Sequence, residues 1–211
     1  DVRRLVAVMA GLGVAQFAPG SDTAANLTTI AELAEIAVAR GATLVLLPEY
    51  SSYFTPEPDE GWLRAAQHLD GEFVMGLGDV ARRLGIHLVA GFIETADATH
   101  VSNTVVAVTP TGAVAAVYRK MHLYDAFGQR ESDWVAPGPI EEPQTFAWEG
   151  FTVGLQTCYD VRFPEVSRRL VDAGADLLLV PAEWVRGPLK EHHWRTLLTA
   201  RALENTVFVA A

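Results

Sequence analysis

The sequence has little of three things, and each scarcity excludes a class of protein. One cysteine in 211 residues rules out an internal disulfide framework and the zinc or iron–sulfur sites that need several thiolates. Basic residues are also few: 16 Lys and Arg stand against 26 Asp and Glu, and a net charge of −10 argues against a nucleic-acid partner. The longest apolar run, residues 5–17, is too short to cross a bilayer.

Two interpretations fit this apolar run. Arg3 and Arg4 precede it, as basic residues precede the apolar part of a secretory signal. Alternatively the run is a buried first strand, because it contains Gln16 and is followed by a Pro-Gly turn. We favour the strand, and we therefore expect a soluble, cytoplasmic protein with no membrane partner.

Half of the residues are apolar, which is too many for a disordered chain and enough for a sizeable core. Apolar spacing, caps and turn residues predict helices at residues 22–40, 72–84, 164–173 and 191–204. The same signals predict strands at 43–47, 86–94, 101–108, 113–119, 145–148, 151–157, 176–180 and 207–211. A long irregular segment at 120–144 remains, and segments of this length inside a compact domain are usually functional or disordered.

One stretch of sequence occurs twice in similar form. Residues 41–48 read GATLVLLP and residues 174–181 read GADLLLVP, each with a helix end, a buried strand and a proline-led loop. This echo predicts two similar α–β units around a common sheet core. We expect one α/β domain over residues 1–211, with helices outside and sheets inside.

Cys158 is the first candidate for chemistry. It follows a predicted strand and precedes a predicted helix, and at such a junction nearby backbone N–H groups can stabilise a thiolate or an oxyanion. The plainer interpretation is a buried, inert thiol. A nucleophilic cysteine also needs a base, and the candidates are a carboxylate or one of six histidines: His68, His87, His100, His122, His192 and His193.

Carboxylate and lysine candidates lie at the ends of predicted strands. Glu49 directly follows a buried strand, where α/β folds place functional groups, although a solvated loop glutamate is an equal alternative. Lys120 opens the long irregular segment and could equally be an ordinary surface lysine. The histidines show no metal-binding spacing, so no metal is predicted. Trp184 fits either a pocket wall or the core.

Two pairs of opposite charge are predicted to be structural. Asp160 and Arg162 are expected to form an ion pair rather than to take part in chemistry. Arg201 and Glu204 have the spacing of neighbours on one helix face, so a salt bridge is expected there as well.

Three segments together resemble the signature segments of the nitrilase, or carbon–nitrogen hydrolase, superfamily. They are LLPE at 46–49, YRKMHL at 118–123 and CYDVRFPE at 158–165, and they occur in the family's order. Shorter matches extend the resemblance over almost the whole chain, at 15–19, 26–27, 91–92, 103–104, 137–138 and 201–205. A single Leu-Pro-Glu would be weak support, but three ordered segments with these anchors are specific.

The resemblance implies a Glu-Lys-Cys triad, which here is Glu49, Lys120 and Cys158, with a second glutamate, Glu131, before the Pro-Gly of the long segment. It also implies a four-layer αββα sandwich that assembles as a homodimer or higher homo-oligomer. The family continues beyond the strand at 207–211, so the C-terminal part is expected to be short or missing here.

The function implied by the resemblance is hydrolysis of a small amide through a cysteine thioester, with release of ammonia and no cofactor. Glu49 is the expected base, and Lys120 with the backbone N–H of Tyr159 is the expected oxyanion stabiliser. We expect Tyr159 and Trp184 to contact substrate. The segment at 158–165 most resembles the branch of omega-amidases and deaminated glutathione amidases, which favours small acidic amides over nitriles. The alternatives are a nitrilase, an N-carbamoyl amidase or a non-catalytic binding module with the same fold.

Overall fold

The two helices that the sequence predicts in the first half of the chain are both present, with the predicted residues at their ends. The computed structural model describes residues 10–211. Helix α1 (Thr23–Ala39) begins after Asp22, whose carboxylate accepts hydrogen bonds from the N–H groups of Ala24 and Ala25. Helix α3 (Glu72–Leu84) ends at Gly85, which has the left-handed conformation typical of a helix C-terminus.

The first sheet has five strands in the order β1-β2-β3-β4-β5. Its strands are β1 (Leu12–Val14), β2 (Leu44–Leu46), β3 (His87–Thr95), β4 (Val101–Val108) and β5 (Val114–Arg119). The strands β1, β2 and β3 are parallel, whereas β3, β4 and β5 form an antiparallel meander. Two strands of this sheet, β2 and β4, are buried along their whole length, because both faces of the sheet are covered.

The second sheet is built from the last third of the chain, and like the first sheet it contains three neighbouring parallel strands. Its order is β6-β7-β8-β9, from β6 (Thr145–Trp148), β7 (Phe151–Leu155), β8 (Leu177–Leu179) and β9 (Phe208–Ala210). Strands β7, β8 and β9 are parallel, and the helices α4 (Pro164–Asp172) and α5 (Lys190–Asn205) connect them. The echo in the sequence thus becomes β2 in one sheet and β8 in the other.

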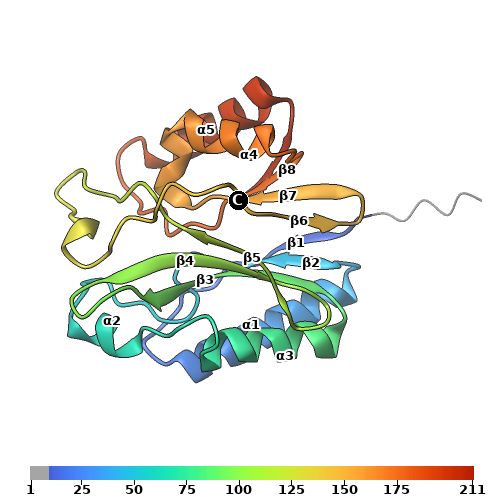
Figure 1. Cartoon of the computed structure of the whole chain (residues 1–211), viewed down its shortest axis with the longest axis horizontal. Helices are drawn as coiled ribbons and strands as arrows, with labels where there is room; N and C mark the ends of the chain where they lie inside the picture. Colours follow the sequence, from blue (N-terminus) through green and yellow to red (C-terminus); the bar gives the residue numbers. More distant parts are fainter. Residues whose placement is uncertain (1–9) are drawn as a thin grey trace, which may run out of the picture.

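The elements form four layers (Figure 1). Helices α1 and α3 cover the outer face of the first sheet, and α4 and α5 cover the outer face of the second. The inner faces meet in a buried apolar cluster that includes Leu44, Leu46 and Val105 from the first sheet and Leu155 and Leu179 from the second. The predicted αββα sandwich is therefore confirmed, and it brings the ends of β2, β5, β7 and β8 toward one region.

Two details of the prediction are wrong. Residues 12–14 form an edge strand rather than a buried one, because β1 pairs only with β2, and Val14 is 55% exposed. Arg3, Arg4 and the beginning of that apolar run lie outside the described residues. The short helix α2 (Glu60–Ala65), which Asp59 caps and Trp62 anchors in the core, was not predicted at all. Within residues 10–211, no helix is long and apolar enough to span a membrane.

Candidate active site

Cys158 lies on a tight turn shortly after strand β7 of the second sheet. It is the first residue of the 3-10 helix η2 (Cys158–Arg162) and has a φ of 44°, a left-handed conformation that non-glycine residues rarely adopt. Its backbone N–H donates to the carbonyl of Pro181, at 3.0 Å, which ties the turn to the end of β8. Cys158 is 7% exposed. Strain of this kind clusters at functional sites and persists only where surrounding contacts hold it.

Glu49 reaches the same region from the end of β2. Its side chain is buried, and its carboxylate accepts hydrogen bonds from Asn103 Nδ2 at 2.7 Å and from Lys120 Nζ at 3.0 Å. The other carboxylate oxygen accepts the backbone N–H of Glu183 at 2.6 Å, and Glu183 follows β8. The Glu49 carboxylate is therefore held by groups from both sheets.

Lys120 places its ammonium between two carboxylates. Nζ lies 3.0 Å from Glu49 Oε1 and 2.9 Å from Glu131 Oε2, and the side chain is 2% exposed. Burial opposes the charged form, but the two carboxylates outweigh burial and hold the pKa of Lys120 well above its usual value. Lys120 is thus a permanent cation at neutral pH.

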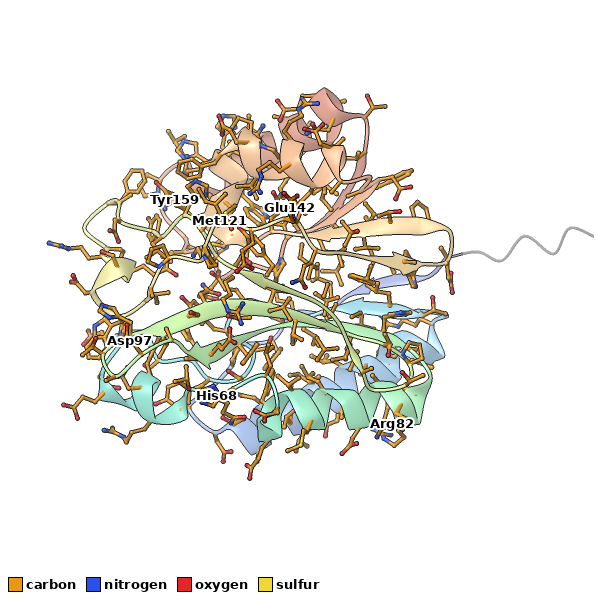
Figure 2. The ribbon with its side chains drawn as sticks, in the orientation of Figure 1. His68, Arg82, Asp97, Met121, Glu142 and Tyr159 are labelled. Atoms are coloured by element: carbon orange, nitrogen blue, oxygen red, sulfur yellow. The ribbon has the colours of Figure 1, made fainter. Side chains whose placement is uncertain are left out.

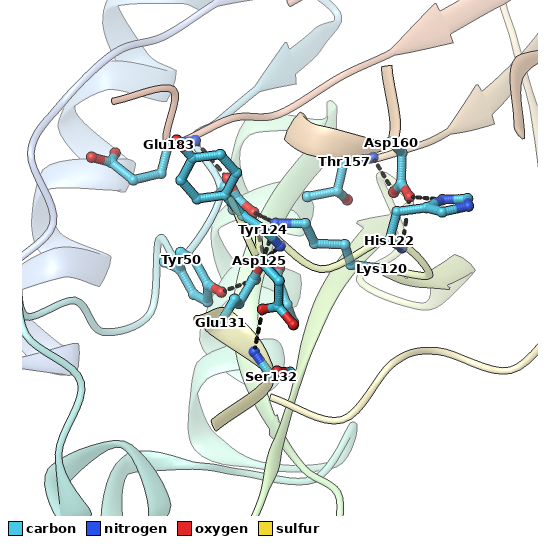
Figure 3. Close-up of polar contacts among 12 residues, drawn as sticks. Tyr50, Lys120, His122, Tyr124, Asp125, Glu131, Ser132, Thr157, Asp160 and Glu183 are labelled. Carbon is cyan, nitrogen blue, oxygen red and sulfur yellow. Dashed lines mark hydrogen bonds and ion pairs between the residues drawn. The ribbon is translucent and has the colours of Figure 1, made fainter. Parts of the chain in front are cut away.

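Glu131 joins the long irregular segment to this cluster. It belongs to the 3-10 helix η1 (Glu131–Asp133) and accepts hydrogen bonds from the Tyr50 hydroxyl at 2.7 Å and the Tyr124 N–H at 2.6 Å (Figure 3). Burial favours the neutral carboxyl, yet Lys120 and these donors lower the pKa of Glu131 below its usual value. The segment expected to be irregular is therefore anchored by a largely buried, ionised carboxylate.

A cavity of about 330 Å³ opens over these side chains. Its walls include Glu49, Lys120, Glu131 and Cys158, together with the predicted substrate contacts Tyr159 and Trp184. Figure 2 shows Tyr159 in the upper half of the molecule and His68, from the loop between α2 and α3, in the lower half. Among the residues that the structure describes, no histidine lines the cavity. Within residues 10–211, no group of three or more His, Cys, Asp and Glu side chains is placed to hold a metal ion.

The environment of the thiol determines how it could act. Burial and the neighbouring Glu49 carboxylate raise the pKa of Cys158 well above its usual value, and Lys120 only partly opposes them. The resting sulfur is therefore protonated and needs a base at the moment of attack. Glu49 supplies a carboxylate beside it, and Lys120 supplies a positive charge for an oxyanion.

Asp160 does not form the expected ion pair with Arg162. Its buried carboxylate accepts a hydrogen bond from the Tyr118 hydroxyl at 2.7 Å. It also accepts the His122 N–H at 3.0 Å and contacts His122 Nδ1 at 2.8 Å (Figure 3). The guanidinium of Arg162 instead lies over the Trp184 ring, 5.3 Å from its centre. Asp160 thus connects the turn of Cys158 to the segment that follows Lys120.

Sequence reasoning missed several partners of the cluster. Asn103 bonds to both Glu49 and Glu131, and its signal was the family match at 103–104, which carried no role for it. Tyr50 and Tyr124 gave no signal of their own, because only the fold brings them to Glu131. The predicted salt bridge between Arg201 and Glu204 is confirmed.

Comparison with known proteins identifies the family. The family described as carbon-nitrogen hydrolase matches residues 11–211. A hydrolase of Mycobacterium tuberculosis is 39% identical over 202 residues, which cover 95% of this chain and 70% of that protein. A deaminated glutathione amidase of Escherichia coli is 39% identical over 196 residues, covering 93% of this chain and 74% of that protein.

Solved structures give the same result. The crystal structure of an amidase from Nesterenkonia sp. superimposes with a TM-score of 0.82 at 30% identity, and the match covers 94% of this chain and 73% of that one. A glutamate-to-glutamine mutant of that amidase shows covalent addition of the acetamide moiety of fluoroacetamide at the active site cysteine. The chain described here belongs to the carbon–nitrogen hydrolase family and is a hydrolase of its amidase type.

Proposed function

We propose that this hydrolase cleaves small amides through a thioester on Cys158, releasing ammonia and a carboxylic acid. The observation that carries the proposal is the convergence of Glu49, Lys120 and Cys158, from three distant segments, on one cavity. Amides are poor electrophiles and ammonia is a poor leaving group, so the site must supply a base, an oxyanion stabiliser and a proton.

In the first step the Cys158 sulfur attacks the amide carbon while its proton moves to Glu49. The raised pKa of Cys158 supports this order, because a neutral thiol must lose its proton during attack. The negative charge that develops on the amide oxygen is stabilised by Lys120 and by the N–H of Tyr159. The first N–H groups of a helical turn have no acceptor within it, and each such donor is worth ~3 kcal/mol in the transition state.

In the second step the carbon–nitrogen bond breaks as Glu49 donates its proton to the nitrogen. Ammonia leaves, and the acyl group remains on the sulfur as a thioester. Glu49 then takes a proton from water, the hydroxide attacks the thioester, and the released sulfur regains its proton from Glu49. The burial of Glu49 and its hydrogen bonds from Asn103 and Glu183 fix one carboxylate for all these transfers.

Glu131 has a positioning role in this scheme. It balances the charge of Lys120 and directs the ammonium toward the cavity, and its donors Tyr50 and Tyr124 fix its own position. The names of the similar proteins support amides rather than nitriles or N-carbamoyl compounds as substrates.

The family resemblance also supports a homodimer or higher homo-oligomer as the working form. We place it in the cytoplasm, where reducing conditions keep a nucleophilic thiol reduced. Sedimentation equilibrium of the purified protein would test the assembly.

The decisive experiment measures ammonia release from matched amides, nitriles and N-carbamoyl compounds. Wild type should act on amides, and the Cys158→Ala variant should lose this activity while it keeps the fold. Mass spectrometry after rapid quenching should find the acyl group on Cys158. Equal turnover by both proteins would refute the assignment of the nucleophile. Preferred turnover of nitriles or carbamoyl compounds would move the enzyme to another subclass of the fold.

A further inference from the structure

Asn103 joins the two glutamates of the cluster through a single amide group. It lies on β4, is 1% exposed, and its Nδ2 donates to Glu49 Oε1 at 2.7 Å and to Glu131 Oε1 at 3.2 Å. A side-chain amide has two N–H hydrogens, so both are used. The reverse orientation would place the amide oxygen against two carboxylate oxygens, and these contacts therefore fix which atom is the nitrogen.

Lys120 bridges the same two carboxylate oxygens. Its Nζ donates to Glu49 Oε1 at 3.0 Å and to Glu131 Oε1 at 3.0 Å. Its backbone N–H donates to the carbonyl of Asn103 at 2.9 Å, so the two residues are neighbours in the first sheet. Two nitrogens and two oxygens thus form a closed ring, in which each oxygen accepts from one neutral and one charged donor.

This ring makes the two oxygens of Glu49 unequal. A carboxylate oxygen has two lone pairs, and Asn103 and Lys120 occupy both lone pairs of Oε1. Among the donors of residues 10–211, only the N–H of Glu183 hydrogen bonds to Oε2, at 2.6 Å. One lone pair of Oε2 therefore stays available for a proton.

Oε2 is also the oxygen on the side of the thiol. The loop after β8 supplies the N–H of Glu183 to Oε2, and in the same loop the carbonyl of Pro181 accepts the N–H of Cys158 at 3.0 Å. The donors to Oε1 come from β4 and from the end of β5, in the other sheet. Oε1 is thus held by the first sheet, and Oε2 by the loop that also holds the turn of Cys158.

We propose that Asn103 is a positioning residue: together with Lys120 it closes Oε1 of Glu49 to protons, so that Oε2 carries the proton of Cys158. This inference rests on the proposed function, in which Glu49 is the base. As the bond between sulfur and the amide carbon forms, the S–H bond breaks and its proton moves to Oε2. As the carbon–nitrogen bond breaks, Oε2 gives this proton to the departing nitrogen.

Two variants remove the amide donor with different shapes. Asn103→Leu keeps the volume of the side chain and Asn103→Ala does not, so either one decides the question if the other fails to fold. Both should lower kcat for butanamide about 10²-fold, because a small misplacement of the base is costly. Calorimetric titration of each variant in the Cys158→Ala protein should give a Kd for butanamide within about twofold of the parent. A loss of affinity as large as the loss of kcat would show a distorted cavity and overturn the inference.

A double-mutant cycle with Glu49 separates this role from a general structural one. The rate at which the acyl group appears on Cys158 is measured by quenching and mass spectrometry in wild type, Asn103→Leu, Glu49→Gln and the double variant. Asn103→Leu should lower this rate about 10²-fold beside Glu49, but less than about threefold in the Glu49→Gln protein, because the proton that it directs then has no acceptor. Equal factors in the two backgrounds would show that Asn103 acts independently of Glu49 and refute the inference.

Thr104, the next residue of β4, provides the matched control. Its buried hydroxyl donates to Glu94 Oε2 at 2.8 Å, a carboxylate outside the cluster. Thr104→Val therefore also removes a buried hydrogen bond to a carboxylate, and it should lower the urea midpoint while kcat stays within about twofold of wild type. A loss of kcat equal to that of Asn103→Leu would mean that any lost hydrogen bond in this strand has the same effect, which would contradict a specific role for Asn103.

The two hypotheses fail in different ways. Ammonia release and acylation of Cys158 in wild type, with equal factors in the cycle, would refute the role of Asn103 and leave the proposed function standing. A wild-type protein that forms no acyl group on Cys158 with any amide would refute the proposed function, and the role of Asn103 with it.

Discussion

The two α–β units of this molecule start from nearly the same sequence and deliver different groups to the cavity. Gly41 and Gly174 both end a helix with a positive φ, and the strands β2 and β8 follow them. After β2 the chain presents the buried carboxylate of Glu49. After β8 it presents the carbonyl of Pro181 to Cys158 and the backbone N–H of Glu183 to Glu49.

The difference arises within the loops that follow the strands. Glu49 comes directly after Pro48, whereas Ala182 separates Glu183 from Pro181. The Glu183 side chain is consequently half-buried, and only its backbone contacts the carboxylate cluster. The repeated sequence therefore brings the loops after β2 and β8 together. The spacing between the proline and the glutamate then decides whether the glutamate offers its side chain, as Glu49 does, or its backbone N–H, as Glu183 does.

The largest expected effect comes from neutralising the two glutamates separately. Glu49→Gln removes the proposed base and should lower kcat about 10²–10⁴-fold. Glu183→Gln keeps the backbone N–H that Glu49 needs, so its effect on kcat should be smaller by at least an order of magnitude. Steady-state ammonia release measures both variants. Similar losses in the two variants would mean that the units contribute equally and that the comparison above is wrong.

Much of the fold could be predicted because its signals are local. The predicted helix 72–84 coincides with α3, since Gly85 and the apolar spacing are both legible in the sequence. The echo between residues 41–48 and 174–181 predicted two related strands, and the sheets confirm them. Helix α2 was missed because six residues beside two prolines give too short a pattern. The exposure of β1 depends on its place at the sheet edge, which its sequence does not encode.

The second-largest effect tests how much stability the cluster around Glu49 gains from the long segment at 120–144. Glu131→Gln leaves the buried ammonium of Lys120 with Glu49 as its one carboxylate partner, and breaking a buried ion pair costs about 3–5 kcal/mol of unfolding free energy. Urea unfolding measures this loss. Glu142→Gln, in an exposed position of the same loop (Figure 2), is the matched control and should stay within about 0.5 kcal/mol of wild type.

The pH dependence of that difference has a definite sign. The folded state lowers the pKa of Glu131, so its carboxylate adds stability above the usual glutamate value of 4.5. This contribution is lost as the pH falls through the lowered pKa of the folded state. The gap between wild type and Glu131→Gln should therefore be constant near neutral pH and shrink in acid. A constant gap down to strongly acidic pH would contradict the ionised state of Glu131.

The residues of the site could be grouped from the sequence only where they belong to a family motif. Cys158, Glu49 and Lys120 were candidates from their places beside predicted strands, but only the family resemblance grouped them with Glu131, and no periodicity or spacing could have shown that they meet. Lys190, at the start of α5, lies close to the aromatic rings of Tyr124, Phe127 and Trp184, which come from two different loops. Asp160 and His122 are 38 residues apart, so the nearer Arg162 was the wrong expectation. Contacts of this kind follow from topology.

A smaller effect is expected from replacing one glycine in each sheet by alanine, and it should differ between the two sheets. A Cβ at Gly91 would lie 2.7 Å from the backbone N of Tyr50 and 2.8 Å from the Cα of Glu49. Gly91→Ala must therefore displace the backbone of Glu49 and Tyr50. We expect a loss of about 1–3 kcal/mol in stability and reduced kcat, because small displacements of a base are costly. In the second sheet, a Cβ at Gly154 would meet the side chain of Leu170 at 3.0 Å. Since that side chain can shift, Gly154→Ala should cost less stability and spare kcat.

The smallest effect has the opposite sign. Burial, and then the charge of Glu49, raise the pKa of Glu183 above its usual value of 4.5, so folding opposes ionisation of this carboxyl. The stability that its protonated form contributes is present below that usual value and is lost as the pH rises through the folded pKa. At neutral pH the ionised Glu183 is therefore slightly destabilising, and Glu183→Gln should stabilise the protein. The gain should be only roughly a few tenths of a kcal/mol, because solvent screens a half-buried carboxylate.

Urea unfolding near neutral pH and again in acid measures this gain. It should disappear in acid, where wild-type Glu183 is itself protonated. Destabilisation by Glu183→Gln at neutral pH would mean that the carboxylate has a favourable partner and that the loop after β8 is held by its side chain as well as by its backbone. Stabilisation there, beside the loss from Glu131→Gln, would instead establish that these two glutamates of one cavity act on folding with opposite sign, because only Glu131 has a cation to bind.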